Sequence, residues 1–245
     1  HIRAMQFTKP GKWEYEVEAE IIHEFMKNGC RSPAYPSIVG GGENGCILHY
    51  IENSAKLKSN ELLLIDAGAE FECYAGDITR TFPVNGKFTT AQAAVYQIVL
   101  NAQKAAIAAV KPGNHWNQPH EAAVEVLTQG LVELGILNGN VDQLIEEGAY
   151  REFYMHRTGH WLGMDVHDVG DYKVGGEWRL LEPGMVLTVE PGLYIRDQDH
   201  VDKKWHFIGI RIEDDVLVTK DGCEVLTEAA PKEIDEIEAL MAEAI

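Results

Sequence analysis

The sequence lacks the features that mark disulfide-rich, zinc-finger, membrane or secreted proteins. Its four cysteines, Cys30, Cys46, Cys73 and Cys223, are scattered without a Cys-x-x-Cys pair, which argues against a zinc finger or a disulfide framework and predicts small buried side chains. No apolar run approaches the roughly 20 residues of a membrane span. No basic segment followed by an apolar one resembles a signal peptide. We therefore expect a cytoplasmic protein, unless a signal has been removed.

Basic residues are also scarce. The chain has 21 lysines and arginines against 39 aspartates and glutamates, so its formal net charge is -18. Nucleic acids and anionic membranes attract basic patches, and this balance therefore excludes both as expected partners. Most of the carboxylates are interpreted as a solubilising surface. A minority remains available as metal ligands, because divalent cations would neutralise them locally.

The chain has 245 residues and opens at His1 without a methionine, inside a stretch that is typical of a helix. We expect a fragment of a longer protein, and we interpret residues 1–245 as one domain, built of two closely packed halves.

Hydrophobic periodicity predicts helices over 14–28, from Thr90 to Pro112 and from Gln118 to Gly135. Strand-like runs predict two hairpins, 62–71 with 74–84 and 186–195 with 207–219. The order indicates an α+β fold, an antiparallel sheet covered by helices, with pseudo-duplicated halves that each deliver one acidic hairpin. The glycine-rich run 40–45 lacks the Lys-Ser/Thr of a phosphate loop and is interpreted as a turn.

Two aspartates lie in the first predicted hairpin. Asp66 and Asp77 stand among strand formers, and their midpoint falls between Phe71 and Glu72. A tight hairpin turning there would place the carboxylates directly opposite each other. Such like charges repel unless a cation bridges them or one takes a proton. Two strand aspartates alone are equally typical of an ordinary surface.

Two glutamates lie in the second predicted hairpin. Glu190 ends an apolar strand, and Glu213 follows a run in which Ile208, Ile210 and Ile212 alternate with Gly209 and Arg211. Alternation with period two puts Arg211 and Glu213 on one face. A solvent-facing strand explains this pattern equally well.

Three of the ten histidines, His156, His160 and His167, fall within twelve residues and have glycines beside them. This density favours a site, because neutral imidazole is both a metal ligand and a proton shuttle. Four carboxylates and one histidine together form an oxygen-rich ligand set that suits two divalent ions. We expect manganese, with cobalt or zinc able to replace it.

These residues resemble the ligand series of the pita-bread metallopeptidases, in the order Asp66, Asp77, His160, Glu190, Glu213. The segments around them are similar to those of bacterial Xaa-Pro aminopeptidases. The matching segments are His156-x-x-x-His160-Trp161-Leu162-Gly163-x-Asp165-Val166-His167-Asp168, Gly76-Asp77-Ile78-Thr79-Arg80-Thr81-Phe82-Pro83, Glu190-Pro191-Gly192-Leu193-Tyr194 and Gly209-Ile210-Arg211-Ile212-Glu213. The resemblance implies the pita-bread fold and hydrolysis of the amino-terminal Xaa-Pro bond.

The resemblance also implies a role for each residue. Asp66 would bind one metal, Asp77 and Glu213 would bridge both ions, and His160 and Glu190 would complete the shell of the other. A hydroxide bridging the two divalent metals would attack the peptide carbonyl, with Glu190 as general base and then acid. His156 and His167 would hydrogen-bond the substrate and the developing oxyanion. His49, Tyr194 and Arg211 would lie at the substrate site, and an ion pair from Arg211 that orients a ligand carboxylate explains that arginine equally well.

Relatives of this type usually carry an amino-terminal domain that supports oligomers, and this sequence does not contain it. We expect homo-oligomers when that domain is present, and peptides with proline at the second position as substrates. The alternatives are a prolidase acting on Xaa-Pro dipeptides, a catalytically silent peptide-binding pita-bread domain and a structural calcium-binding protein. The acidic loop 197–202 lacks the glycine and terminal glutamate of a calcium loop and is interpreted as solvated.

Overall fold

A computed structural model describes residues 1–243. Its helices are α1 (Ile2–Phe7), α2 (Glu14–Lys27), α3 (Thr90–Ala109), α4 (Gln118–Glu133), α5 (Val141–Glu147) and α6 (Ile234–Ala242). Its strands are β1 (Ser32–Pro33), β2 (Ile38–Gly41), β3 (Leu62–Asp66), β4 (Ala69–Phe71), β5 (Tyr74–Ala75), β6 (Thr79–Pro83), β7 (Lys173–Val174), β8 (Glu177–Trp178), β9 (Val186–Val189), β10 (Gly192–Ile195), β11 (Ile208–Arg211), β12 (Asp214–Val218) and β13 (Cys223–Val225). The strand pairs are antiparallel, which confirms the predicted α+β class.

The three predicted helices are confirmed: each begins at its predicted residue and ends one to three residues earlier than predicted. Helix α3 begins where expected because the Thr89 hydroxyl accepts a hydrogen bond from the Gln92 backbone N–H, while the Gln92 side chain accepts one from the Thr89 backbone N–H. Helix α4 carries a proline in its first turn, where no backbone donor is lost. The short helix α5 and the carboxyl-terminal α6 lie in segments for which no helix was predicted.

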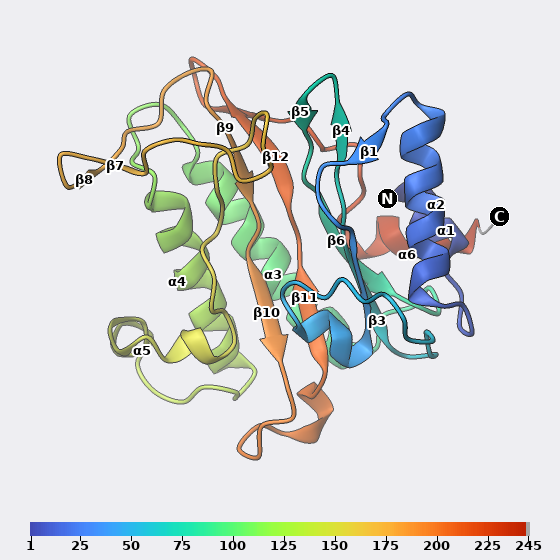
Figure 1. Cartoon of the computed structure of the whole chain (residues 1–245). Helices are drawn as coiled ribbons and strands as arrows, with labels where there is room; N and C mark the ends of the chain where they lie inside the picture. Colours follow the sequence, from blue (N-terminus) through green and yellow to red (C-terminus); the bar gives the residue numbers. More distant parts are fainter. Residues whose placement is uncertain (244–245) are drawn as a thin grey trace.

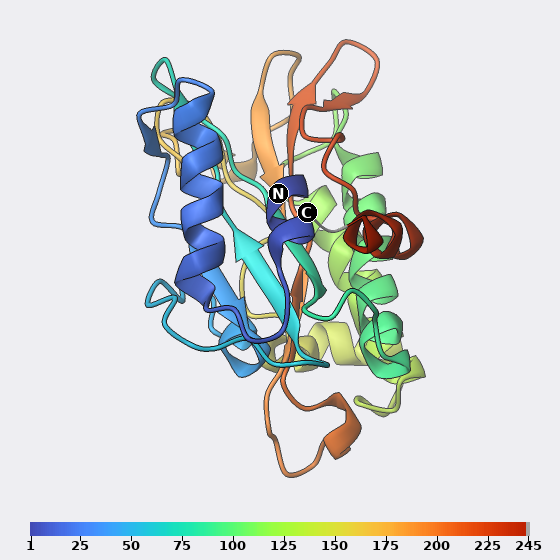
Figure 2. The ribbon, with the colours of Figure 1, turned by 90° about the vertical axis from the view of Figure 1, so that its right-hand side faces the viewer.

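The molecule has two halves, each with a layer of strands and its own helices. Strands β2, β3 and β6 form one sheet, and α2 packs on β2. In the other half, β9, β10 and β11 contact α3, which is paired with α4. Figure 2 shows the strands between α2 on one side and α3 and α6 on the other. Each half contributes a pair of antiparallel strands, β3 with β6 and β9 with β12, as the predicted pseudo-duplication requires (Figure 1).

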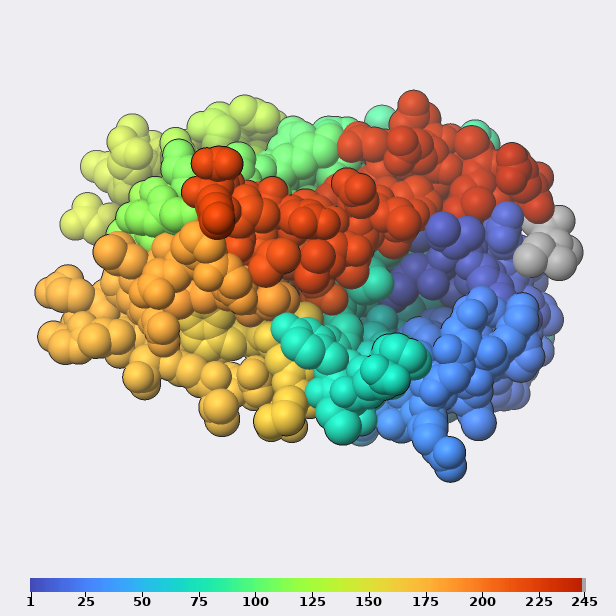
Figure 3. Space-filling model, turned by 90° about the horizontal axis from the view of Figure 1, so that it is seen from above, coloured from blue at the N-terminus to red at the C-terminus, as the bar shows by residue number. Residues whose placement is uncertain are grey.

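The principal hydrophobic core runs from Ala4 in α1 to Met241 in α6. Helix α1 also packs against α6, so the first and last helices lie side by side (Figures 1 and 2). Seen from above, the β7–β8 hairpin and the tip of β4–β5 stand at the surface (Figure 3). No helix of residues 1–243 is both long and apolar enough to cross a membrane.

Two local predictions were wrong. Gly40 and Gly41 belong to β2 and pair with Leu64 and Leu63, so only the part from Gly42, a short 3-10 helix, is turn-like. A side chain at Gly40 would crowd the backbone of that 3-10 helix, which explains a glycine inside a strand. Among the cysteines, Cys46 is buried as expected, but Cys73 is exposed.

Candidate metal centre

The acidic hairpins and the histidine segment converge on one cavity of about 850 Å³. Nine of the ten predicted site residues line it, namely His49, Asp66, Asp77, His156, His160, His167, Glu190, Arg211 and Glu213. The tenth, Tyr194, is fully buried behind them. Side chains that are far apart in the sequence therefore share one site.

The first hairpin has a different register from the predicted one. Asp66 pairs with Thr79, two residues beyond Asp77. The shift arises at the turn, where Glu72 and Cys73 both have positive φ and form a two-residue loop. Asp77 therefore lies just outside β6.

The two aspartates nevertheless meet. The Tyr35 hydroxyl oxygen lies 2.5 Å from a carboxylate oxygen of Asp66 and 2.5 Å from one of Asp77. Tyr35 thus bridges the two carboxylates from outside the hairpin, and the predicted proximity is confirmed although its register was wrong.

The second hairpin brings Glu190 and Glu213 face to face. Val189 pairs with Asp214 and Gly192 pairs with Arg211, so the two glutamates occupy opposing positions between these ladders. Their backbone N–H groups bond elsewhere, Glu190 to the Thr158 carbonyl at 2.8 Å and Glu213 to the Thr79 carbonyl at 3.1 Å. Glu213 is only 1% exposed, so the solvent-facing interpretation of its strand was wrong.

His160 approaches the carboxylates from the long segment before β7, which lies beside β9 because Trp161 forms an isolated bridge with Leu187. Its Nε2 lies 3.4 Å from Asp77 and 3.6 Å from Glu190. Its Nδ1 lies 3.0 Å from the Trp161 carbonyl and donates to it, which leaves Nε2 to face the carboxylates. A side chain at Gly159 would clash with the Thr188 carbonyl, so glycine is needed for this close approach.

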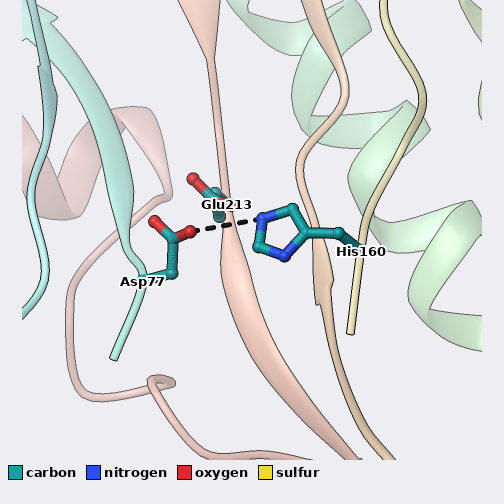
Figure 4. A group of neighbouring side chains, drawn as sticks. All are labelled: Asp77, His160 and Glu213. Carbon is teal, nitrogen blue, oxygen red and sulfur yellow. Dashed lines mark ion pairs between the residues drawn. The ribbon is translucent and has the colours of Figure 1, made fainter. Parts of the chain in front are cut away.

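Three of the expected ligands already form a compact group. Ligand atoms of Asp77, His160 and Glu213 all lie within 4.8 Å of one another, and Figure 4 shows the three side chains pointing toward a common point.

The electrostatics of the cluster favour a cation. Burial, reinforced by the Asp66 charge, raises the pKa of Asp77 to about 6. Burial raises the pKa of Glu190 to about 7, and burial together with the neighbouring carboxylates raises that of Glu213 well above its usual range. Burial lowers the pKa of His160, but hydrogen bonding to Asp77 and the Glu190 charge outweigh it and raise the value to about 9. Crowded, buried carboxylates of this kind favour positive charge among them, so the donor set fits divalent metal ions.

Arg211 ties several of these groups together. One guanidinium nitrogen lies 2.6 Å from Asp66, another donates to the Tyr194 hydroxyl at 2.9 Å and Nε donates to the Thr79 hydroxyl at 3.1 Å. Thr79 in turn donates to Glu213 at 2.6 Å. The contact with Asp66 agrees with the interpretation in which Arg211 orients a ligand carboxylate.

His156 is held by two protein contacts. Its Nδ1 donates to the Arg157 carbonyl at 2.8 Å, so its Nε2 accepts from the Tyr194 hydroxyl at 2.8 Å. Burial, helped by the Arg211 charge, lowers the pKa of His156 to about 3, so this ring is neutral. A substrate contact by His156 therefore requires exchange of one of these bonds.

His167 and His49 also contribute rings to the cavity wall. The His167 ring stands edge-on to His160, with 4.3 Å between the ring centres. Burial and the nearby His160 charge lower the pKa of His167. Both rings are therefore placed to meet a ligand in the cavity.

Tyr35, Thr79 and Asp215 belong to the site but were not predicted from the sequence. Asp215 accepts a hydrogen bond from the Asp77 backbone N–H at 3.1 Å and so supports this expected ligand from the opposite half. Thr79 and Asp215 stand close in sequence to predicted ligands, and that proximity was the available signal. Tyr35 lies 31 residues before Asp66, in a segment with no local signal.

The model of metallopeptidase family M24 matches residues 1–220. The chain belongs to this family. It is 56% identical to the Xaa-Pro aminopeptidase of Haemophilus influenzae over 241 residues, which are 98% of this chain and 56% of the relative. It is 54% identical to the Xaa-Pro aminopeptidase of Escherichia coli over 98% of this chain and 54% of that one.

Solved structures agree with the family assignment. The aminopeptidase PepP of Pseudomonas aeruginosa superposes with a TM-score of 0.98 at 62% identity, covering 99% of this chain and 55% of that one. The expected pita-bread fold of this M24 domain is confirmed. The chain spans little more than half the length of the relatives that it matches.

Proposed function

We propose that this M24 domain is the catalytic part of a metal-dependent Xaa-Pro aminopeptidase, which hydrolyses the bond between the first residue of a peptide and a following proline. The observation that carries the proposal is the convergence of Asp66, Asp77, His160, Glu190 and Glu213 on one cavity. The names of relatives at 54–56% identity support the substrate class.

We assign the five residues as ligands of two divalent ions. Asp77 from one half and Glu213 from the other would bridge the two ions. Asp66, which contacts Arg211, would bind one of them, and His160 and Glu190 would complete the shell of the other. Ions held there would polarise the peptide carbonyl and make a bound water acidic at neutral pH. Oxygen-rich sets favour manganese. Zinc is an alternative, because one solved relative is a "Zn substituted" E. coli aminopeptidase P.

The remaining residues handle protons and orientation. Glu190 has one oxygen 3.6 Å from His160 and the other 3.6 Å from His156, so its carboxylate faces the centre of the site and serves as general base and then acid. Arg211, Thr79 and Tyr35 hold carboxylates in place through hydrogen bonds. His49 and His167 line the cavity and contact the substrate.

A dedicated enzyme suits this bond. Proline has no backbone N–H and restricts the residue before it, so hydrolysis depends on a cavity shaped for the ring rather than on pairing with an extended backbone. Ile38, Leu48 and Ile51 supply apolar wall to that cavity.

The test is release of the amino-terminal residue from matched tripeptides, Ala-Pro-Ala and Ala-Ala-Ala, with added Mn²⁺ and after chelation. We expect cleavage of the proline peptide only, abolished by the chelator and by Glu190→Gln. Cleavage that persists without metal, or no preference for proline, would contradict the proposal.

The same assay with the dipeptide Ala-Pro added distinguishes an aminopeptidase from a prolidase, the nearest alternative. A prolidase would cleave Ala-Pro and leave Ala-Pro-Ala intact. We propose that the protein is cytoplasmic and that it forms homo-oligomers when an amino-terminal domain is present. Cell fractionation tests the compartment, and sedimentation of a chain that carries such a domain tests the oligomeric state.

A further inference from the structure

One cation at the cavity is not neutralised by a neighbouring carboxylate. Arg157 follows His156, lines the cavity and is exposed. Its guanidinium donates to the side-chain oxygen of Asn117 and lies over the Trp178 ring, 5.3 Å from the ring centre. Among residues 1–243 no carboxylate forms an ion pair with it. The guanidinium is therefore oriented, and its charge remains available to a ligand.

The orientation is built by neutral partners. Asn117 donates from its amide nitrogen to Glu121 at 2.6 Å, which turns its oxygen toward Arg157. The other arginine in the cavity wall, Arg211, is 4% exposed and already committed to Asp66 and Tyr194. Arg157 is consequently the arginine of this wall that an incoming anion can reach.

Aromatic side chains surround this position. Trp116 and Tyr172 line the same cavity with ring centres 4.7 Å apart, and Trp178 lies under the Arg157 guanidinium. The Lys173 ammonium lies 4.2 Å from the Trp178 ring centre and adds positive potential there. An aromatic wall with a fixed guanidinium suits a peptide segment that ends in a carboxylate.

A peptide substrate carries a cation at its amino terminus and an anion at its carboxyl terminus. The cation of Arg157 repels the former and attracts the latter. We propose that Arg157 binds a carboxylate on the residue after proline, either the terminal carboxylate of a tripeptide or an Asp or Glu side chain. This inference rests on the proposed function and deepens it, because it makes Arg157 a residue that selects peptides by the charge of their third residue.

The test compares kcat/KM for Ala-Pro-Ala with its carboxyl-terminal amide, and for Ala-Pro-Asp-amide with Ala-Pro-Asn-amide. We expect the native domain to prefer the charged member of at least one pair by roughly tenfold. Arg157→Gln should bring that ratio close to one by lowering kcat/KM for the charged substrate alone. Arg157→Lys should restore part of the preference. The matched control is Arg151→Gln, because Arg151 lies over the Tyr150 ring and is not part of the cavity wall. This control should change neither ratio.

A preference for the acid within the first pair identifies the terminal carboxylate as the group that Arg157 binds. A preference for Asp within the second pair identifies the side-chain carboxylate. Ratios near one in the native domain, or ratios that survive in Arg157→Gln, would overturn the inference while leaving Xaa-Pro cleavage intact. If no peptide is cleaved, the proposed function fails. Calorimetric binding of the same acid and amide pairs to the native and Arg157→Gln proteins then still decides the inference.

Discussion

A buried ion pair behind the metal centre allows a quantitative prediction about stability. Arg80 and Asp214 are both completely buried, with 2.7 Å between their charged groups. Arg80 also donates to the carbonyls of Thr79, Glu213 and Ala230 at 2.5–2.9 Å. It therefore joins the carboxyl-terminal segment to the strands that hold the expected ligands.

Replacing Arg80 by Met removes one partner of this pair and the donors to three buried carbonyls. Breaking a buried pair from one side costs about 3–5 kcal/mol. Asp214 keeps contacts with Lys232 at 2.5 Å, Gln103 at 2.6 Å and Thr227 at 2.7 Å. We therefore expect the free energy of unfolding to fall by about 3 kcal/mol, the low end of that range. This is a large share of the roughly 5–15 kcal/mol by which a typical domain is stable.

The assay is urea unfolding followed by circular dichroism, in excess chelator so that metal binding does not add to the stability. Arg3→Met is the control, because the pairs of Arg3 with Glu20 and Glu24 are partly exposed, and it should leave the urea midpoint almost unchanged. A loss below about 1 kcal/mol in Arg80→Met would refute the assigned role of this network.

Three further predictions concern the site and its surroundings. Thr79→Val removes the 2.6 Å bond to Glu213 and should lower Mn²⁺ affinity by about 10–100-fold; unchanged calorimetric affinity would argue against it. Tyr35→Phe removes the hydroxyl between Asp66 and Asp77 and should lower activity while preserving the circular dichroism spectrum, whereas full activity would show that the bridge is dispensable. Burial, helped by the charge of Arg157, lowers the pKa of His120 to about 4. The unfolded state binds that proton more readily, so the free energy of unfolding should fall as pH drops from about 6.5 toward 4. If the free energy of unfolding of a His120→Gln variant fell with pH as steeply as that of the native domain, this prediction would be contradicted.

Local patterns predicted the helices and hairpins because their signals lie within a few residues. The helical periodicity that begins at Thr90 and the period-two alternation of Ile208, Ile210 and Ile212 are examples. The predicted register of the first hairpin was wrong because the true register depends on two residues of positive φ, Glu72 and Cys73, and neither is glycine. Nothing in their identity indicates that conformation.

The expected ligands were found from their residue types together with the family resemblance. The supporting contacts were harder to predict because they join distant segments. Tyr35 reaches the aspartates from 31 and 42 residues away, and Asp215 meets Asp77 across 138 residues. The Asp215–Asp77 contact is created by the packing of the two halves against each other, whereas Tyr35 reaches the aspartates from a loop of their own half. Periodicity carries no information about either kind of packing.

The most direct test of the metal centre is the Mn²⁺ stoichiometry of the metal-free domain, measured by calorimetry and by metal analysis after gel filtration. In the proposed centre Asp77 and Glu213 are ligands of both ions, so we predict two ions per chain in the native domain. In Asp77→Asn we predict fewer than two ions, lost activity and an unchanged fold. A native domain that binds no Mn²⁺, or an Asp77→Asn variant that still binds two ions with native affinity, would contradict the assignment of the centre.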